Sequence, residues 1–300
     1  MDPITKAIHI KYLAVNPVDL LWGVAVHTVG CQDIAPGMPY PPSNHPSRYI
    51  FSEEKGRILN EYQLIYITKG SGKFTSASLG KWVSVGRGSM FLLFPGEWHS
   101  YRPDKETGWN EFWIGFSGPV IDSRIRNGFF SKDKPVFRAG IHNEIVDLYS
   151  NAIDTASHQE SGFQPLLGSI VIHLLGLAYF YERNETFRST EVSDMVNRAK
   201  ILISEQYRTI RPEQLADTLC MGYSNFRKVF REYTGFSPAK YIQEVRFNKA
   251  KELLTNSSMS VKEVAAELGF EDYEYFFTAF KRVTGMTPAG YRAMTKGESS

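Results

Sequence analysis

The first half of the chain alternates short apolar runs with turn-forming residues. Tyr62 to Thr68 forms one such run and ends at Lys69-Gly70-Ser71-Gly72, which favours a hairpin turn before a strand resumes at Lys73. Further runs rich in aromatic and branched residues lie at 82–85, 90–94 and 109–116. Several short strands at close spacing predict a β-sandwich or a small β-barrel.

The period of the apolar residues changes near Asn143. From Ile145 to Ile153 the apolar positions follow helical spacing. A second helix, predicted for Leu166 to Tyr181, is largely apolar but shorter than the ~20 residues that span a bilayer, so we expect a buried or dimer-forming helix. The polar stretch Glu182 to Thr190 follows it and is the best candidate for a linker between domains.

The last third of the chain contains one pattern twice. The segments 215–219, 226–230 and 238–241 recur as 264–268, 276–280 and 288–291. Matched residues are 49 apart before the turn and 50 apart after it, so the copies differ by one residue inserted in the turn. Each copy has a short helix, a Gly-containing turn and a second helix with an aromatic pair. This pattern predicts a helix-turn-helix whose second helix enters a DNA major groove.

Capping residues mark the helix boundaries in this repeat. Ser237 and Thr287 each precede a proline, and Ser260 with Glu263 forms a capping box. A helix from about Pro238 to Thr255 joins the two copies. A rigid joint fixes the distance between two recognition helices, which must lie about 34 Å apart to read one face of B-DNA.

The first recognition helix is predicted at Ser224 to Thr234. One face carries Phe226, Val229, Phe230 and Tyr233 and is expected in the core. The outward residues are candidates for DNA contacts: Ser224, Asn225, Arg227, Lys228 and Arg231. Arg227 and Lys228 match the chemistry of guanine O6 and N7, whereas an ordinary solvated helix face is the alternative.

The second recognition helix begins at Glu271 in the sequence pattern and is less basic. Its acids, Glu271, Asp272 and Glu274, stand where phosphates approach, and Thr278 replaces the basic residue found at Lys228. We expect a weaker DNA contact through this helix. The candidate residues are Tyr273, Glu274, Tyr275, Lys281 and Arg282. Alternatively, the acids read cytosine N4 or discriminate against wrong sites.

Composition sets limits on the class of protein. The chain of 300 residues has a net charge of only +2, so local clusters of basic residues indicate DNA binding better than the total does. Two distant cysteines, Cys31 and Cys220, favour neither a disulfide framework nor a zinc site. The N-terminus lacks the pattern of a signal peptide, and we expect a cytoplasmic protein.

The repeat, its joining helix and the ending Phe280-Lys281-Arg282 with Gly285-Met286-Thr287-Pro288 and Tyr291-Arg292 resemble the DNA-binding domain of the AraC/XylS family of bacterial transcription regulators. The resemblance implies that Ser224, Arg227 and Lys228 face the first major-groove segment. The positions of Tyr273, Glu274 and Thr278 face the second. The basic residue often found in the family at Thr278 is missing here.

Residues from about Asn16 to Gly118 are similar to the cupin-like effector domain of that family, through 62–72, 88–99 and 113–116. The resemblance to its sugar-responsive member implies an effector site at Arg57, Tyr101, Glu111 and Trp113. An ordinary place in the barrel core for Trp113 and a surface charge for Arg57 are the alternative roles. His99 lacks the His-x-His pair of metal-binding cupins, so we expect no metal and no cofactor. The Pro-rich segment Ala35 to Pro46 is interpreted as an arm or loop over the mouth, or a mobile connection.

The fold class expected is α+β and multidomain. A cupin-like β-barrel with two flanking helices precedes an all-α domain of two helix-turn-helix units joined by a helix. The expected segments are an effector-binding barrel with an N-terminal arm at 1–140, a helical dimerisation segment at 141–182, a linker at 183–192 and the DNA-binding domain at 193–296.

The function expected is that of a non-enzymatic, sequence-specific regulator, an activator or a repressor, that senses a sugar or sugar derivative. Its expected partners are double-stranded DNA, a small-molecule effector and a second copy of the chain, with RNA polymerase as a further candidate and no membrane. Two alternatives stay open: a metal-dependent cupin enzyme with a helical appendage, and an effector-independent regulator whose barrel only dimerises.

Overall fold

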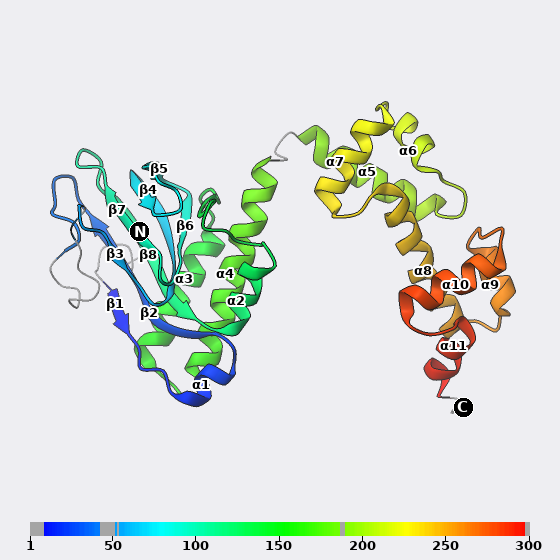
Figure 1. Ribbon diagram of the computed structural model, residues 1–300, viewed down its shortest axis with the longest axis horizontal. Coiled ribbons are helices and arrows are strands. Elements are labelled where there is room, and N and C mark those ends of the chain that lie inside the picture. Colours follow the sequence, from blue (N-terminus) through cyan, green and yellow to red (C-terminus); the bar gives the residue numbers. More distant parts are fainter. Residues whose placement is uncertain (1–8, 43–51, 53, 187–189, 298–300) are drawn as a thin grey trace. The chain divides into compact units, whose positions relative to one another are not determined.

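The computed structural model describes residues 9–42, 52, 54–186 and 190–297. The chain forms two compact units that meet in sequence between Thr186 and Phe187 (Figure 1). The first unit holds the strands, and the second is helical throughout the residues described. The strands and helices of the first unit are β1 (His9–Tyr12), α1 (Pro17–Leu21), β2 (Ala25–Ile34), β3 (Arg57–Ile58), β4 (Tyr62–Ser76), β5 (Val83–Gly86), β6 (Ser89–Leu93), β7 (Trp98–Pro103), β8 (Trp109–Ser117), α2 (Pro119–Arg126), β9 (Val136–Arg138), α3 (Asn143–His158) and α4 (Phe163–Thr186).

The strands of the first unit pair antiparallel and form one folded sheet. Its main path runs β1-β2-β8-β4-β6-β9. The first part of β4 pairs with β8 and β6, and its second part pairs with β5 and β7. Among the strands described, no pairing joins β1 to β9. The sheet-rich fold is therefore as predicted, but the expected barrel is open.

The hairpin turn expected at 69–72 is wrong, because β4 continues through it as one strand of 15 residues. The pairing register with β8 shifts between Ile67 and Lys69, where the strand passes from one half of the sheet to the other. Gly70 adopts a φ of +79°, and a Cβ at Gly72 would lie 2.2 Å from the carbonyl oxygen of Arg102. These glycines allow a bend and a close strand approach rather than a chain reversal.

Alternation along β4 distributes apolar side chains to two cores. Leu64 and Tyr66 point to a cluster shared with α3 and α4, which lie along one face of the sheet (Figure 1). Ile65 and Ile67 point to a second cluster between the two halves of the sheet. Gln164 of α4 bonds both the N–H and the carbonyl of Val26 at 2.9 Å, which anchors the helix to β2.

Helix α4 is longer than the predicted 166–181. It is the one helix in the described residues that is long and apolar enough to cross a membrane by length and composition, and half of its most apolar window is buried inside the unit. Burial against the sheet and α3 is typical of a core helix. The division between the two units falls within the predicted linker 183–192. Residues 183–186 continue α4 and 190–192 begin α5, while 187–189 lie outside those described.

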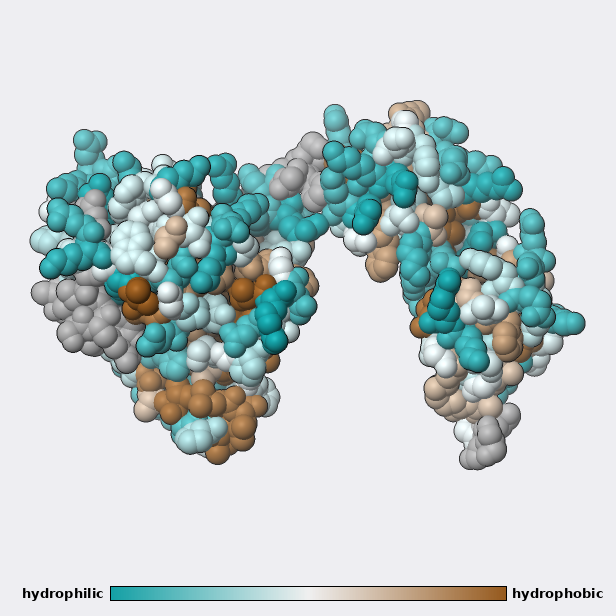
Figure 2. Space-filling view, in the orientation of Figure 1, coloured by the Kyte–Doolittle hydropathy of each residue, from teal (hydrophilic) through white to brown (hydrophobic). Residues whose placement is uncertain are grey.

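Helix α1 presents an apolar patch on the surface of the first unit. Val18, Leu21 and Trp22 are exposed by 72%, 84% and 57%, and the patch is brown over α1 in Figure 2. Trp22 also lies against Gly168, where a Cβ would come within 3.2 Å of the indole. Contiguous exposed apolar side chains of this kind are typical of an interaction surface.

The second unit consists of two helix-turn-helix motifs that are joined by one helix. Its helices are α5 (Thr190–Gln206), α6 (Pro212–Thr218), α7 (Tyr223–Thr234), α8 (Pro238–Asn256), α9 (Val261–Glu267), α10 (Tyr273–Thr284) and α11 (Pro288–Lys296). The first core contains Phe226 and Phe230 with Ile242 of α8. The second contains Phe276 and Phe280 with Phe247 of α8. Helix α8 therefore joins the two motifs through their cores, as predicted.

The duplication extends to individual atoms. The turn between α6 and α7 spans four residues, 219–222, and that between α9 and α10 spans five, 268–272, so the inserted residue lies in the turn as predicted. The hydroxyls of Thr234 and Thr284 donate to the carbonyls of Phe230 and Phe280 at 2.7 and 2.8 Å. The caps at Ser237, Ser260 and Thr287 are present as predicted.

Candidate functional site

A small pocket lies between the two halves of the sheet in the first unit. The four predicted effector residues, Arg57, Tyr101, Glu111 and Trp113, all line it. Its cavity is about 30 Å³, close to the space of one water molecule. The other lining residues are Tyr12, Gln32, Tyr40, Pro41, Gln63 and Ile65.

Arg57 on β3 is oriented by three side chains. Its Nε donates to His99 Nε2 at 3.2 Å, and its Nη2 donates to Tyr101 Oη at 2.5 Å and to Gln63 Oε1 at 3.2 Å. The guanidinium also lies over the Tyr101 ring, 5.4 Å from the centroid. These contacts fix the direction of a positive charge at the pocket.

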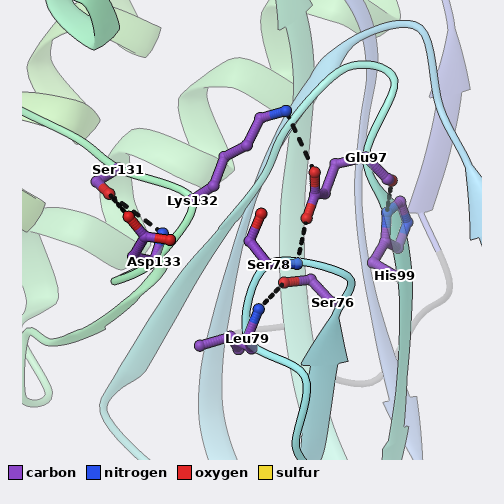
Figure 3. A network of polar contacts seen from close by, with 8 residues as sticks. All are labelled: Ser76, Ser78, Leu79, Glu97, His99, Ser131, Lys132 and Asp133. Atoms are coloured by element: carbon purple, nitrogen blue, oxygen red, sulfur yellow. Dashed lines mark hydrogen bonds and ion pairs between the residues drawn. The ribbon is translucent and has the colours of Figure 1, made fainter.

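His99 has a structural role next to Arg57. Its Nδ1 bonds the backbone oxygen of Glu97 at 3.1 Å, while the carboxylate of Glu97 is held by the Ser78 N–H at 2.7 Å and by Lys132 at 3.2 Å (Figure 3). Burial lowers the pKa of His99 to about 3, with the Arg57 charge acting in the same direction. The ring is therefore neutral, donates through Nδ1 and accepts from Arg57 through Nε2.

Glu111 on β8 supplies a buried carboxyl group at the opposite wall. It accepts a hydrogen bond from the Gln32 side-chain amide. The Tyr40 hydroxyl lies 3.2 Å from Oε1 and 3.1 Å from Oε2 of Glu111 and donates to this carboxyl group. Burial raises the pKa of Glu111 to about 7, against the effect of these hydrogen bonds and of Arg57. A group with this pKa changes its charge near neutral pH.

Four polar or aromatic residues that line the pocket were not predicted from the sequence: Tyr12, Gln32, Tyr40 and Gln63. Gln32 is the direct cross-strand partner of Glu111, and Gln63 occupies a buried position of β4 two residues from Ile65. A polar residue at an inward position of an alternating strand was the signal for both. Tyr12 and Tyr40 enter from β1 and from the Pro-rich segment expected over the mouth. Residues 43–46 of that segment lie outside those described.

No group of three His, Cys, Asp or Glu side chains that could hold a metal ion occurs in the described residues. His99 is instead engaged by Arg57 and by the Glu97 backbone. The pocket thus combines a guanidinium, a carboxyl group, two side-chain amides and aromatic faces. Such a set can bind hydroxyl groups through hydrogen bonds and apolar C–H faces through its rings.

Helix α7 in the second unit separates a buried face from an outward face. Phe226 and Phe230 are fully buried with their ring centroids 5.4 Å apart and their planes tilted, and Phe230 packs against Tyr241 of α8. The five predicted DNA-contacting residues are all exposed: Ser224, Asn225, Arg227, Lys228 and Arg231. The outward face of α7 carries three cations.

Helix α10 begins two residues later than the pattern predicted. Asp272 is its N-cap, and the Asp272 side chain accepts from the N–H of Glu274 at 2.8 Å. One of the three acids therefore has a capping role, and Glu271 precedes the helix. Glu274, Tyr275, Lys281 and Arg282 are exposed and Tyr273 is half-buried, so the predicted residues share an outward face of mixed charge.

Two of the α10 tyrosines have partners inside the unit. Tyr275 accepts a hydrogen bond from the Gln243 side chain at 3.1 Å, and Lys262 lies 5.8 Å from the Tyr273 ring centroid. Gln243 belongs to α8 and Lys262 to α9. These contacts hold the start of α10 against its neighbouring helices.

The two sites define a class of protein: a transcription regulator that joins a ligand-binding unit to paired helix-turn-helix units. Residues 215–294 match the helix-turn-helix domain family, and residues 40–175 match the AraC-like ligand binding domain. The chain belongs to the AraC/XylS family of transcription regulators.

The chain is similar to two curated relatives and to one solved structure. The raffinose operon transcriptional regulatory protein of Pediococcus pentosaceus is 27% identical over 81% of this chain and 88% of the relative. The arabinose operon regulatory protein of Escherichia coli is 26% identical over 69% of this chain and 72% of the relative. The DNA-binding domain of AdpA, solved with a target DNA, is 29% identical over 36% of this chain and 96% of that domain, with a TM-score of 0.33.

Proposed function

We propose that this regulator binds DNA chiefly through α7 and that a carbohydrate in the pocket of its first unit controls that binding. The observation that carries the proposal is the convergence of Arg57, Glu111 and Trp113 on one pocket in a chain that also holds a paired helix-turn-helix. Names of relatives that include raffinose and arabinose operons support a sugar. The chain acts as a regulator and not as an enzyme.

The side chains that line the pocket have the chemistry that a carbohydrate ligand needs. Arg57 and Glu111 bond hydroxyl groups in fixed directions, and the aromatic rings cover the apolar face of a sugar. A neutral ligand of this type needs both donors and acceptors at the site, which the side-chain amides of Gln32 and Gln63 also provide.

Calorimetric titration of the full chain with raffinose and L-arabinose tests this assignment. We expect saturable binding of at least one sugar and an affinity at least about tenfold lower in Glu111→Ala. Glu106→Ala, which removes an exposed carboxylate, serves as the control. Absence of binding by every sugar tested would exclude the carbohydrate assignment.

Control of DNA binding requires a ligand that favours one arrangement of the chain over another. In the mechanism we propose, effector binding changes how barrel, dimer helices and linker are arranged, so that the DNA-binding units of a dimer reach different half-sites. The regulator acts in the cytoplasm, with RNA polymerase as a further partner.

The dimer in this proposal forms through the helical segment 141–182. Leu166 and Phe180 of α4 are exposed by 54% and 55%, and both are large apolar side chains. Their burial against a second copy would remove this surface from water. Sedimentation of the full chain with Leu166→Glu tests it, because the charged variant should shift the protein towards monomer; Ile201→Glu on α5 is the matched control.

A further inference from the structure

Two cavities lie on either side of one tyrosine in the first unit. The inner cavity is the effector pocket of about 30 Å³. An outer cavity of about 260 Å³ is lined by Ala35, by 37–40 and by 101–105. Tyr40 and Tyr101 line both cavities, so their rings form the partition between them.

Tyr40 fills the partition from an exposed segment. Residues 35–39 are exposed, whereas the Tyr40 side chain turns inward from them. Its ring lies 6.0 Å from the Tyr101 centroid and meets Trp109 edge-on at 5.6 Å. The N–H of Gly37 donates to the carbonyl of Lys105 at 2.9 Å, which ties the segment beside the outer cavity.

The Tyr40 hydroxyl makes the hydrogen bonds expected of a ligand hydroxyl. It donates towards the two oxygens of Glu111, at 3.2 and 3.1 Å, inside a pocket whose other polar groups are Arg57, Gln32 and Gln63. With this side chain in place, the inner cavity has room for about one water molecule. Small-molecule sites usually enclose about 300 Å³ or more.

We propose that Tyr40 occupies part of the effector site and that a carbohydrate of at least two rings binds by displacing its side chain. This inference rests on the proposed function. One sugar ring then takes the place of the phenol beside Glu111 and Trp113, and the next ring lies in the outer cavity among Arg102, Asp104 and Lys105. Tyr40 is thus a specificity-determining residue, because its displacement joins the two cavities into one site.

Displacement has a measurable consequence for affinity. When a site is open in only a fraction of the molecules, its apparent dissociation constant equals the intrinsic one divided by that fraction. Truncation in Tyr40→Ala removes the competitor, so raffinose affinity should rise about tenfold, and Tyr40→Phe, which loses only the bonds to Glu111, should give about threefold. Phe236→Ala, which removes an exposed aromatic ring from the other unit, should leave the affinity unchanged.

A probe that is not a sugar tests the occupancy of the site by itself. p-Cresol has the structure of a free tyrosine side chain, and it should raise the thermal midpoint of Tyr40→Ala, followed by tryptophan fluorescence, but not that of the wild-type chain. Stabilisation of the variant without any sugar binding would support Tyr40 as an occupant and would overturn the carbohydrate assignment. If Tyr40→Ala failed to fold, the threefold gain in Tyr40→Phe would carry the test.

Two results would overturn the inference. One is a loss of raffinose affinity in both Tyr40 variants, because it would make the tyrosine a ligand contact in its present position. The other is equal affinity of the wild-type chain for galactose and raffinose together with no effect of p-cresol on Tyr40→Ala, because neither a second ring nor a vacated phenol site would then contribute.

Discussion

Arg57 and Glu111 face one pocket, and each has neutral hydrogen-bond partners. The guanidinium of Arg57 donates to His99, Gln63 and Tyr101, and the carboxyl group of Glu111 accepts from Gln32 and Tyr40. Partners of this kind orient a charge without neutralising it. A ligand hydroxyl between the two residues can therefore donate to the carboxylate and accept from the guanidinium.

The raised pKa of Glu111 predicts how stability depends on pH. Its pKa of about 7 in the folded chain exceeds the ordinary 4.5, so the folded state binds more protons between these two values. The free energy of unfolding of the first unit should therefore fall as pH rises from about 4.5 to 7, on the order of 3 kcal/mol at most.

The measurement for this prediction is denaturant unfolding followed by tryptophan fluorescence at several pH values. In Glu111→Gln the amide cannot titrate, so the slope over this window should flatten. An unchanged slope in Glu111→Gln would mean that another group is responsible.

Arg227 is the residue we expect to contribute most to base recognition. Its exposed guanidinium on α7 can form two hydrogen bonds to a guanine, so Arg227→Ala should cost about 1–3 kcal/mol on the specific site and relax preference at one base pair. Arg198→Ala, which removes an exposed charge from α5, should not change base preference. Equal binding of wild type and Arg227→Ala in a titration would exclude this role.

Glu274 on α10 should matter less than Arg227. Its carboxylate is exposed at a helix start that is already capped by Asp272. We expect Glu274→Ala to change the affinity by less than Arg227→Ala does in the same titration. A larger loss for Glu274→Ala would mean that α10 is the main reader.

At the level of single residues, the sequence predicted four side chains that line the pocket but not the side chain that fills part of it. Arg57, Tyr101, Glu111 and Trp113 are implied by the family resemblance alone, and all four line the pocket. Tyr40 was not predicted, because it lies in a segment without periodicity, and its direction depends on packing against Tyr101 and Trp109. Alternation patterns say which face of a strand is buried, but not which loop side chain fills a gap.

Among the elements, helices with caps were predicted to within a few residues. Ser237, Ser260 and Thr287 form local hydrogen bonds that depend on three or four neighbouring residues. The turn expected within β4 was wrong because Gly70 and Gly72 serve contacts with β7 and β8, strands distant in sequence. Long-range packing of this kind leaves no local signature.

Two glycines of α4 test whether this helix packs as a core element. A Cβ at Gly168 would meet the carbonyl oxygen of Val24 at 3.0 Å, whereas no atom lies within 4 Å of a Cβ at Gly176. Gly176→Ala should raise the free energy of unfolding by about 0.5–1 kcal/mol, because alanine favours the helix. The gain should be lost in Gly168→Ala, measured by the same denaturant unfolding. Equal gains at both positions would contradict tight packing of α4 on the sheet.

Considered as a whole, the chain has separate cores on the two sides of residue 187. All five tryptophans, at positions 22, 82, 98, 109 and 113, belong to the first unit. Tryptophan fluorescence therefore follows the sheet unit alone, while circular dichroism at 222 nm also follows the helical unit.

Unfolding of the full chain should show two transitions that these signals separate. A carbohydrate effector should shift the fluorescence transition, because it binds and stabilises the first unit. A DNA duplex should stabilise the second unit, and it should therefore shift the transition that is seen by circular dichroism but not by fluorescence. Coincident transitions under all conditions would mean that the two units unfold as one.

The central claim is that a carbohydrate in the first unit controls how the second unit binds DNA. Selection of duplexes from a random pool by the full chain, with and without raffinose, tests it most directly. We predict that both pools share one motif read by α7, and that raffinose changes the spacing of paired motifs or their enrichment, an effect absent in Glu111→Ala. Identical pools with and without every sugar that the chain binds would contradict the account.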